Sequence, residues 1–136
     1  MMITIDDYVG PHKKCPDWTM ACHGNACLLL TAVSALEERA KQDGIVFKIN
    51  PKTKTQVSGT KFGGFRPMDC CEGSPKSSHK QGLGVDIYDP DNVIDKWLTD
   101  DILKECGLYR EHPDDTPRWC HLTIRPPASQ KRTFKP

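Results

Sequence analysis

The chain has 136 residues, of which 27% are charged and 37% hydrophobic, so it has room for one domain around one modest hydrophobic core. Its 19 Lys and Arg residues and 18 Asp and Glu residues give a net charge of +1, without the basic excess typical of nucleic-acid-binding proteins. The longest apolar run, 26–36, is too short to span a membrane, and the first residues lack the pattern of a signal peptide. We therefore expect one domain over 1–136, with no nucleic-acid binding, no membrane insertion and no signal peptide.

The first half of the chain predicts one long helix. Residues 1–24 are interrupted by glycine and proline and predict an irregular segment. Asn25 is a suitable helix N-cap, and 26–42 carries apolar residues at helical spacing, so an amphipathic helix is predicted there. A short strand is predicted over 45–49, where hydrophobic residues are frequent.

The second half predicts strands around another helix. Residues 52–76 are polar and rich in glycine and proline, which indicates loops with room for one strand. Residues 84–88 predict a buried strand, and 92–106 predict a second amphipathic helix. Two further strand candidates are 108–109 and 119–124. The remaining residues, 125–136, are basic and begin with Arg-Pro-Pro, so an extended tail without regular structure is expected, either solvated or used for docking.

The seven cysteines leave their chemical state open. An odd number cannot all pair within one chain, and none has the Cys-x-x-Cys spacing of a structural zinc site. The group Cys15, Cys22, His23 and Cys27 suggests a second metal site, but its spacing matches no common zinc finger. Disulfides or free buried thiols are the favoured interpretation.

The most informative stretch is 77–87, in which His79 precedes two glycines and an aspartate inside an apolar strand. Burying an unpaired carboxylate costs several kcal/mol, so Asp86 needs a partner, and a cation is one such partner. His121 lies on another predicted strand, where period-two alternation turns it to the same face as Trp119. Two imidazoles and one carboxylate form a common protein shell for catalytic zinc, with a fourth position open to water.

The pattern Ser-x-His-x-x-Gly-x-x-x-Asp followed by Trp-x-His resembles the zinc D-Ala-D-Ala carboxypeptidase and L-Ala-D-Glu endopeptidase group (peptidase M15), which includes many phage endolysins. The matching positions are Ser77, His79, Gly82, Asp86, Trp119 and His121. The resemblance implies one Zn²⁺ ion per chain, bound by His79, Asp86 and His121. The segment Gly64-Phe65-Arg66-Pro67 resembles the Ser-Gly-Tyr-Arg segment of the family, which assigns Arg66 to substrate binding and to charge stabilisation beside the metal.

The resemblance extends to the order of the elements along the chain. It implies an α+β fold like that of D-Ala-D-Ala carboxypeptidases and hedgehog proteins: a single domain with a central, mainly antiparallel sheet flanked by helices. The predicted helices and strands agree with this arrangement.

The position of the catalytic acid departs from the family pattern. Many members carry it three residues before the last histidine, where this chain has Arg118. The nearest acids are Glu111, Asp114 and Asp115. Glu111 is favoured as the general base because it directly follows the strand candidate 108–109. Ser77 is expected to shape the turn between the ligands and to contact substrate, and His112 is a secondary candidate for holding the transition state.

The expected function is zinc-dependent hydrolysis of peptide bonds in bacterial peptidoglycan stem peptides. The protein would be a phage endolysin or a virion-associated cell-wall peptidase, located in the virion or in the host cytoplasm before release to the wall. An alternative is a catalytically weak or inactive zinc-stabilised module of a phage tail or baseplate, which contacts other virion proteins. Arg118 and the number of cysteines favour that alternative. A third hypothesis is a disulfide scaffold without metal.

Overall fold

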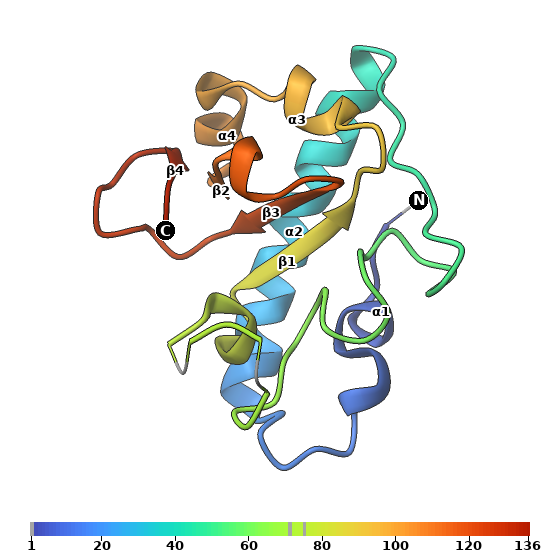
Figure 1. The fold of residues 1–136 in the computed structure, drawn as a ribbon, viewed down its shortest axis with the longest axis vertical. Helices are drawn as coiled ribbons and strands as arrows, with labels where there is room; N and C mark the ends of the chain where they lie inside the picture. Colours follow the sequence, from blue (N-terminus) through green and yellow to red (C-terminus); the bar gives the residue numbers. More distant parts are fainter. Residues whose placement is uncertain (1, 71, 75) are drawn as a thin grey trace.

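One long helix and a sheet form the framework of the molecule. The computed structural model describes residues 2–70, 72–74 and 76–136, and in it helix α2 (Met20–Gln42) runs behind the sheet (Figure 1). The hydroxyl of Thr19 accepts a hydrogen bond from the backbone amide of Cys22 and so caps the N-terminus of the helix. The buried apolar side chains of α2 are Cys22, Ala26, Leu29, Leu30, Val33, Leu36 and Ala40.

The sheet has four strands in the order β1-β3-β2-β4. These are β1 (Gly84–Tyr88), β2 (Tyr109–Glu111), β3 (Trp119–Thr123) and β4 (Thr133–Phe134). Strand β3 is antiparallel to both β1 and β2, whereas β4 is parallel to β2. The predicted small α+β domain is therefore confirmed, and its sheet is mixed.

The register between β1 and β3 separates an apolar face from a polar one. The core receives the fully buried side chains of Val85, Ile87, Cys120 and Leu122. Because side chains alternate along a strand, the residues between them turn to the opposite face. There Asp86 pairs directly with His121 across the two strands.

The other helical segments are short. They are α1 (Ile5–Val9), η1 (Gly10–His12), η2 (Ser78–Gln81), α3 (Val93–Trp97), α4 (Asp100–Cys106) and η3 (Pro113–Asp115). Within the described residues, no helix combines the length and the apolar character that crossing a bilayer requires.

The prediction of an irregular segment over 1–24 is wrong. Helix α1 forms there because Thr4 and Asp7 make a capping box, in which each side chain bonds the backbone amide of the other residue. Helix α2 also starts earlier than predicted, with Thr19 as its N-cap. Asn25 lies inside the helix, and its side-chain Nδ2 donates to the carbonyl of Gln81.

The strand predicted over 45–49 does not form. The free edge of β1 pairs instead with the loop 56–63, through hydrogen bonds from Ser58 N to Asp86 O and from Tyr88 N to Gln56 O. Within 45–49, only Phe47 is buried, while Val46 is 70% exposed. In that segment, therefore, Phe47 packs into the core, and the other apolar residues do not take part in a strand.

The helix predicted over 92–106 is divided into α3 and α4. Leu98 has an extended backbone and is buried, and the hydroxyl of Thr99 accepts the amide of Ile102 to start a new helix. A competing N-cap thus interrupts a continuous apolar pattern.

The tail over 125–136 is partly regular, which corrects the prediction of a wholly irregular end. Strand β4 is held against β2 by hydrogen bonds from Arg110 N to Arg132 O at 2.8 Å and from His112 N to Phe134 O at 2.7 Å. The guanidinium of Arg132 also lies 4.2 Å from the ring centroid of Tyr109.

Candidate metal centre

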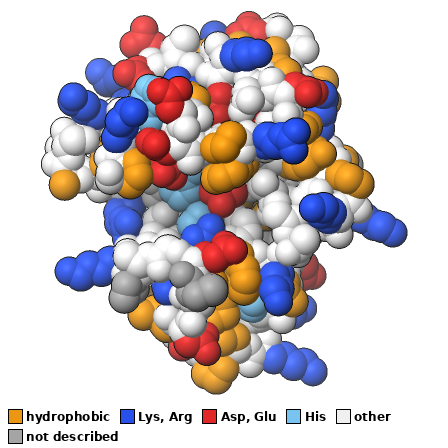
Figure 2. All heavy atoms as spheres, viewed as in Figure 1, with side chains coloured by type: hydrophobic (Ala, Val, Ile, Leu, Met, Phe, Trp, Pro, Cys, Tyr) orange, Lys and Arg blue, Asp and Glu red, His pale blue; other side chains and the backbone are white. Residues whose placement is uncertain are grey.

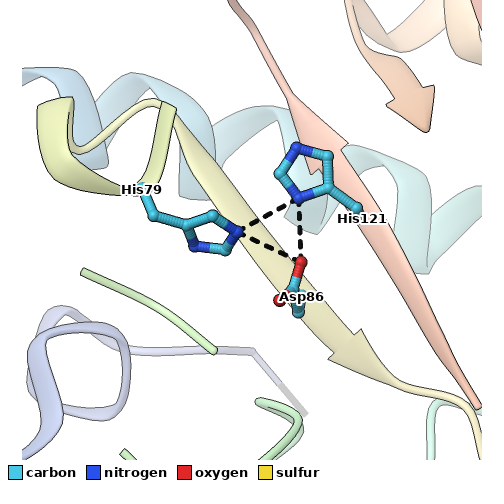
Figure 3. A group of neighbouring side chains, drawn as sticks. All are labelled: His79, Asp86 and His121. Carbon is cyan, nitrogen blue, oxygen red and sulfur yellow. Dashed lines mark hydrogen bonds and ion pairs between the residues drawn. The ribbon is translucent and has the colours of Figure 1, made fainter. Parts of the chain in front are cut away.

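Three side chains converge on one point above the polar face of the sheet (Figure 3). Oδ1 of Asp86 lies 2.8 Å from Nδ1 of His121 and 3.2 Å from Nε2 of His79. The two imidazole nitrogens are 3.2 Å apart. All three residues are buried, so their nitrogen and oxygen atoms are largely shielded from solvent.

The local sequence explains how the ligands meet. His79 lies on η2, whose N-terminus is capped by the hydroxyl of Ser77, 3.3 Å from the amide of His79. Gly82 then reverses the chain with φ at +75°, and a Cβ at this position would lie 2.5 Å from the carbonyl oxygen of Cys22. This tight turn places η2 directly before β1, which carries Asp86.

The outer nitrogen of each imidazole has a partner that can accept a hydrogen bond from it: the Gly64 carbonyl can only accept, whereas the Ser78 hydroxyl can accept or donate. Nδ1 of His79 donates to the carbonyl of Gly64 at 2.8 Å, and Nε2 of His121 lies 3.4 Å from the hydroxyl of Ser78. With protons on these outer nitrogens, both inner nitrogens direct lone pairs toward the Asp86 carboxylate. Three acceptors at hydrogen-bond distance repel one another unless a cation or a proton lies between them.

The size and chemistry of the triangle suit a metal ion. Its sides of 2.8 to 3.2 Å are close to the edge of a tetrahedral zinc shell, about 3.3 Å for bonds of about 2.0 to 2.1 Å. His79, Asp86 and His121 form the only group of this kind among the described residues. The group can therefore hold one metal ion.

Arg66 contacts the other oxygen of the same carboxylate. Its Nη2 lies 3.3 Å from Oδ2 of Asp86, while its Nε donates to the carbonyl of Phe62 at 2.7 Å. Burial alone would raise the pKa of Asp86, but the charges and hydrogen bonds of His79 and His121, when their inner nitrogens carry protons, outweigh it and hold the pKa of that carboxyl well below its ordinary value. Asp86 is thus held as a carboxylate, the form that binds a cation.

The triad lies at the base of an open cavity of about 670 Å³. Figure 2 shows this hollow in the middle of the face, with histidine side chains at its floor. Besides the triad, its walls include Arg66, Ser77, Glu111, Asp115, Trp119, Arg125, Phe134 and Lys135. The cavity therefore combines the possible metal ligands with both cationic and anionic side chains.

Glu111 is the half-buried acid of this cavity. It ends strand β2, and burial raises the pKa of its carboxyl, with further increases from Asp86 and Asp115. Arg118, which occupies the usual position of the family acid, is exposed and does not line the cavity. Its backbone has φ at +74°, and its amide donates to Oδ1 of Asn92.

The structure brings most of the predicted site residues together. Arg66, Ser77 and Glu111 share the cavity with the triad. His112 does not line it, and its Nδ1 instead accepts the amide of Asp114 at the start of η3. Trp119 is partly exposed in the cavity wall.

Several contributors were missed by the sequence analysis. Ser78 and the carbonyl of Gly64 hold the imidazoles, and the tail supplies part of the cavity wall, including Phe134. The adjacent serines at 77 and 78 offered a signal, because a serine hydroxyl can accept a hydrogen bond from an imidazole N–H, but the motif contains only Ser77. The carbonyl of Gly64 has no side-chain signal at all.

The described cysteines are free thiols, which is one of the two states that the sequence favoured, and Cys22 and Cys120 are the buried ones among them. Cys15, Cys22, Cys27, Cys70, Cys106 and Cys120 are free thiols, and Cys71 lies outside the described residues. In the group considered as a second metal site, the thiols of Cys15 and Cys22 point to Asp17, and only Cys27 approaches His23, at 3.8 Å. These residues do not converge on a common point.

Comparisons with protein-family models, with curated proteins and with solved structures each returned no match. The function is therefore inferred from the site itself and from the motif that its residues form.

Proposed function

We propose that this protein is a zinc-dependent peptidase that hydrolyses peptide bonds in bacterial peptidoglycan stem peptides. The observation that carries the proposal is the convergence of three acceptor atoms, from His79, Asp86 and His121, within 3.2 Å of one another. They lie at the base of a cavity that also contains Glu111 and Arg66. This combination matches the needs of metal-assisted hydrolysis.

His79, Asp86 and His121 would bind the zinc ion and leave a coordination position open toward the cavity. When bound there, zinc lowers the pKa of a water ligand to about 7 and polarises the carbonyl of the scissile bond. Asp86 contributes a negative charge, and the Gly64 and Ser78 contacts keep the imidazoles in the tautomers that metal binding requires.

Glu111 is the proposed general base. Its carboxylate would accept a proton from the attacking water and deliver it to the leaving amine. Burial raises the pKa of Glu111, which makes its carboxylate a stronger base than an exposed glutamate. Its position at the end of β2 compensates for the absence of an acid at position 118.

Arg66 is the proposed electrostatic stabiliser. Two of its donors are occupied by Phe62 O and by Asp86, which fixes the orientation of the guanidinium. Its other N–H groups remain for the negative charge that develops on the carbonyl oxygen of the substrate. Ser77 lies on the same cavity wall and is proposed to contact the substrate backbone.

The motif supports the choice of peptidoglycan as the substrate, because the family that it resembles acts on D-amino-acid-containing wall peptides. On the same basis we propose a fold relation to D-Ala-D-Ala carboxypeptidases and hedgehog proteins. The ligand set drawn from one turn and two antiparallel strands supports this relation. The protein would act as a phage endolysin or as a wall-cutting component of the virion.

The test combines metal analysis with an assay for new amino groups released from purified peptidoglycan. The wild type should contain about one zinc per chain and release amino groups. His121→Ala should lose both properties, whereas Glu111→Gln should keep the metal and lose release. Glu105→Gln, which removes an exposed acid on α4 outside the cavity, is the matched control and should behave as the wild type.

The other outcomes separate the competing hypotheses. One zinc per chain with no release from several wall types would favour a structural module of a phage tail or baseplate. A purified protein that binds no zinc would contradict the proposal at its first step.

A further inference from the structure

The C-terminal strand is positioned to act as part of the site. It pairs in parallel with β2. Thr133 turns away from the cavity, and its hydroxyl donates to Oδ1 of Asp100 on α4 at 2.7 Å. The next residue, Phe134, faces the metal ligands, and its ring lies edge-on to His121 with centroids 6.4 Å apart. The alternation along β4 therefore places Phe134 on the polar face of the sheet, and Lys135 follows it beyond the end of the strand, where it lines the cavity.

Three cationic side chains line the cavity, but two of them are already engaged. Arg66 binds Asp86 and the carbonyl of Phe62. Nη1 of Arg125 donates to the carbonyl of Lys76 and to the side-chain oxygen of Gln81, both at 2.6 Å. Lys135, by contrast, has no hydrogen-bond or ion-pair partner among the described residues, and it is exposed to solvent at the cavity wall.

We propose that Lys135 is a specificity-determining residue that binds a carboxylate of the substrate peptide, and that the tail from 127 to 136 forms the wall that presents it. This inference rests on the proposed function and deepens it by selecting acidic peptides. The substrate group is the free carboxylate of the D-Glu residue in the stem peptide. A lysine ammonium without a partner in the protein is available to pair with that group.

The charges on the other walls strengthen the assignment. Asp86, Glu111 and Asp115 are anionic and line the same cavity, so they disfavour a substrate carboxylate in their vicinity. The substrate carboxylate is best accommodated on the wall where an unpaired cation lies. Phe134 on the same wall lies edge-on to His121, so the proposed carboxylate subsite adjoins the residues of the triad.

The experiment uses two stem peptides that differ only in whether the D-Glu carboxylate is free or amidated. The wild type should have a lower KM for the acidic peptide, by about threefold to tenfold, because an exposed ion pair contributes modestly. Lys135→Ala should raise KM for the acidic peptide to that of the amide, with kcat little changed. Lys135→Arg should retain the preference, and Lys135→Glu should reverse it.

The matched control is Lys131→Ala, which removes an exposed lysine from the same tail that does not line the cavity. Binding of each peptide to the zinc-loaded Glu111→Gln variant, with and without Lys135→Ala, is measured by calorimetry as a readout that does not depend on turnover. Equal affinity for both peptides, unaffected by Lys135→Ala, would overturn the role of Lys135.

These readouts also separate the two proposals. If the wild type hydrolyses both peptides with equal KM, the peptidase proposal stands and the tail subsite fails. If no peptide is hydrolysed but the acidic one binds through Lys135, the subsite stands and the peptidase proposal fails.

Discussion

At the residue scale, the chemistry of the triad depends on which nitrogen of each histidine carries the proton. His79 is oriented by a backbone carbonyl and His121 by the hydroxyl of Ser78. Both inner nitrogens are consequently free to bind an ion together with Asp86. A metal site that depends on these outer contacts should weaken when one of them is removed.

Ser78→Ala tests this dependence. Without the hydroxyl, Nε2 of His121 loses its acceptor, and the imidazole can rotate or adopt the wrong tautomer. The affinity for zinc should fall about 10-fold to 100-fold, the range typical of outer-shell substitutions. Competition with a chromophoric chelator measures this change. Ser34→Ala on α2 is the control and should leave the affinity unchanged; an equally unchanged affinity in Ser78→Ala would remove the assigned role.

At the scale of elements, local patterns predicted what a segment can form but not which partner it would find. The strand at 84–88 and its buried aspartate could be predicted because an apolar run with a single charge is conspicuous. The strand predicted at 45–49 does not form because the edge of β1 pairs with the loop 56–63 instead. Tertiary contacts determine this pairing, and the local sequence does not show them. Strand β4 has only two residues, too few for any period-two signal.

The candidate site was predictable to a similar extent and for related reasons. His79, Asp86 and His121 have side chains that are chemically conspicuous, and their spacing matches a known motif. The start of α2 was missed because Thr19 and Asn25 are both good N-cap residues, and sequence alone does not choose between them. The tail wall was missed because its contribution depends on parallel pairing with β2.

The close contact between η2 and β1 leads to a prediction about Gly84, the first residue of β1. A Cβ at Gly84 would overlap the hydroxyl oxygen of Ser78 and lie 3.1 Å from Cε1 of His121. Gly84→Ala should therefore push both side chains out of place and lower the free energy of unfolding by about 1 to 3 kcal/mol. It should also weaken zinc binding.

Gly24→Ala is the matched comparison, because it makes the same substitution inside α2, where a Cβ meets nothing within 4 Å. That change should raise the free energy of unfolding by about 0.5 to 1 kcal/mol. Urea denaturation of both variants measures the difference. Effects of the same sign would show that crowding at Gly84 does not govern its stability.

At the scale of the whole molecule, the cavity that holds the triad adjoins a second hollow. A smaller cavity of about 260 Å³, formed largely by the loop at 58–63, shares Arg66, Asp86 and Trp119 with the main cavity. The two hollows therefore adjoin at these three residues. For the peptidase that we propose, we expect an extended substrate peptide to occupy both hollows.

Within the proposed function, two adjoining hollows favour an endopeptidase over a carboxypeptidase. An enzyme that removes a terminal residue needs a site that is closed beyond the scissile bond, whereas a groove open on both sides admits an internal bond. A stem peptide acetylated at its N-terminus and amidated at its C-terminus should therefore be cleaved internally, at a rate within about threefold of the unblocked peptide, since the terminal charges would be exposed and weakly coupled to the site. Mass spectrometry of the products identifies the bond, and Glu111→Gln provides the inactive control. Cleavage that requires a free terminal carboxylate, with release of single amino acids, would instead assign the smaller hollow no part in substrate binding.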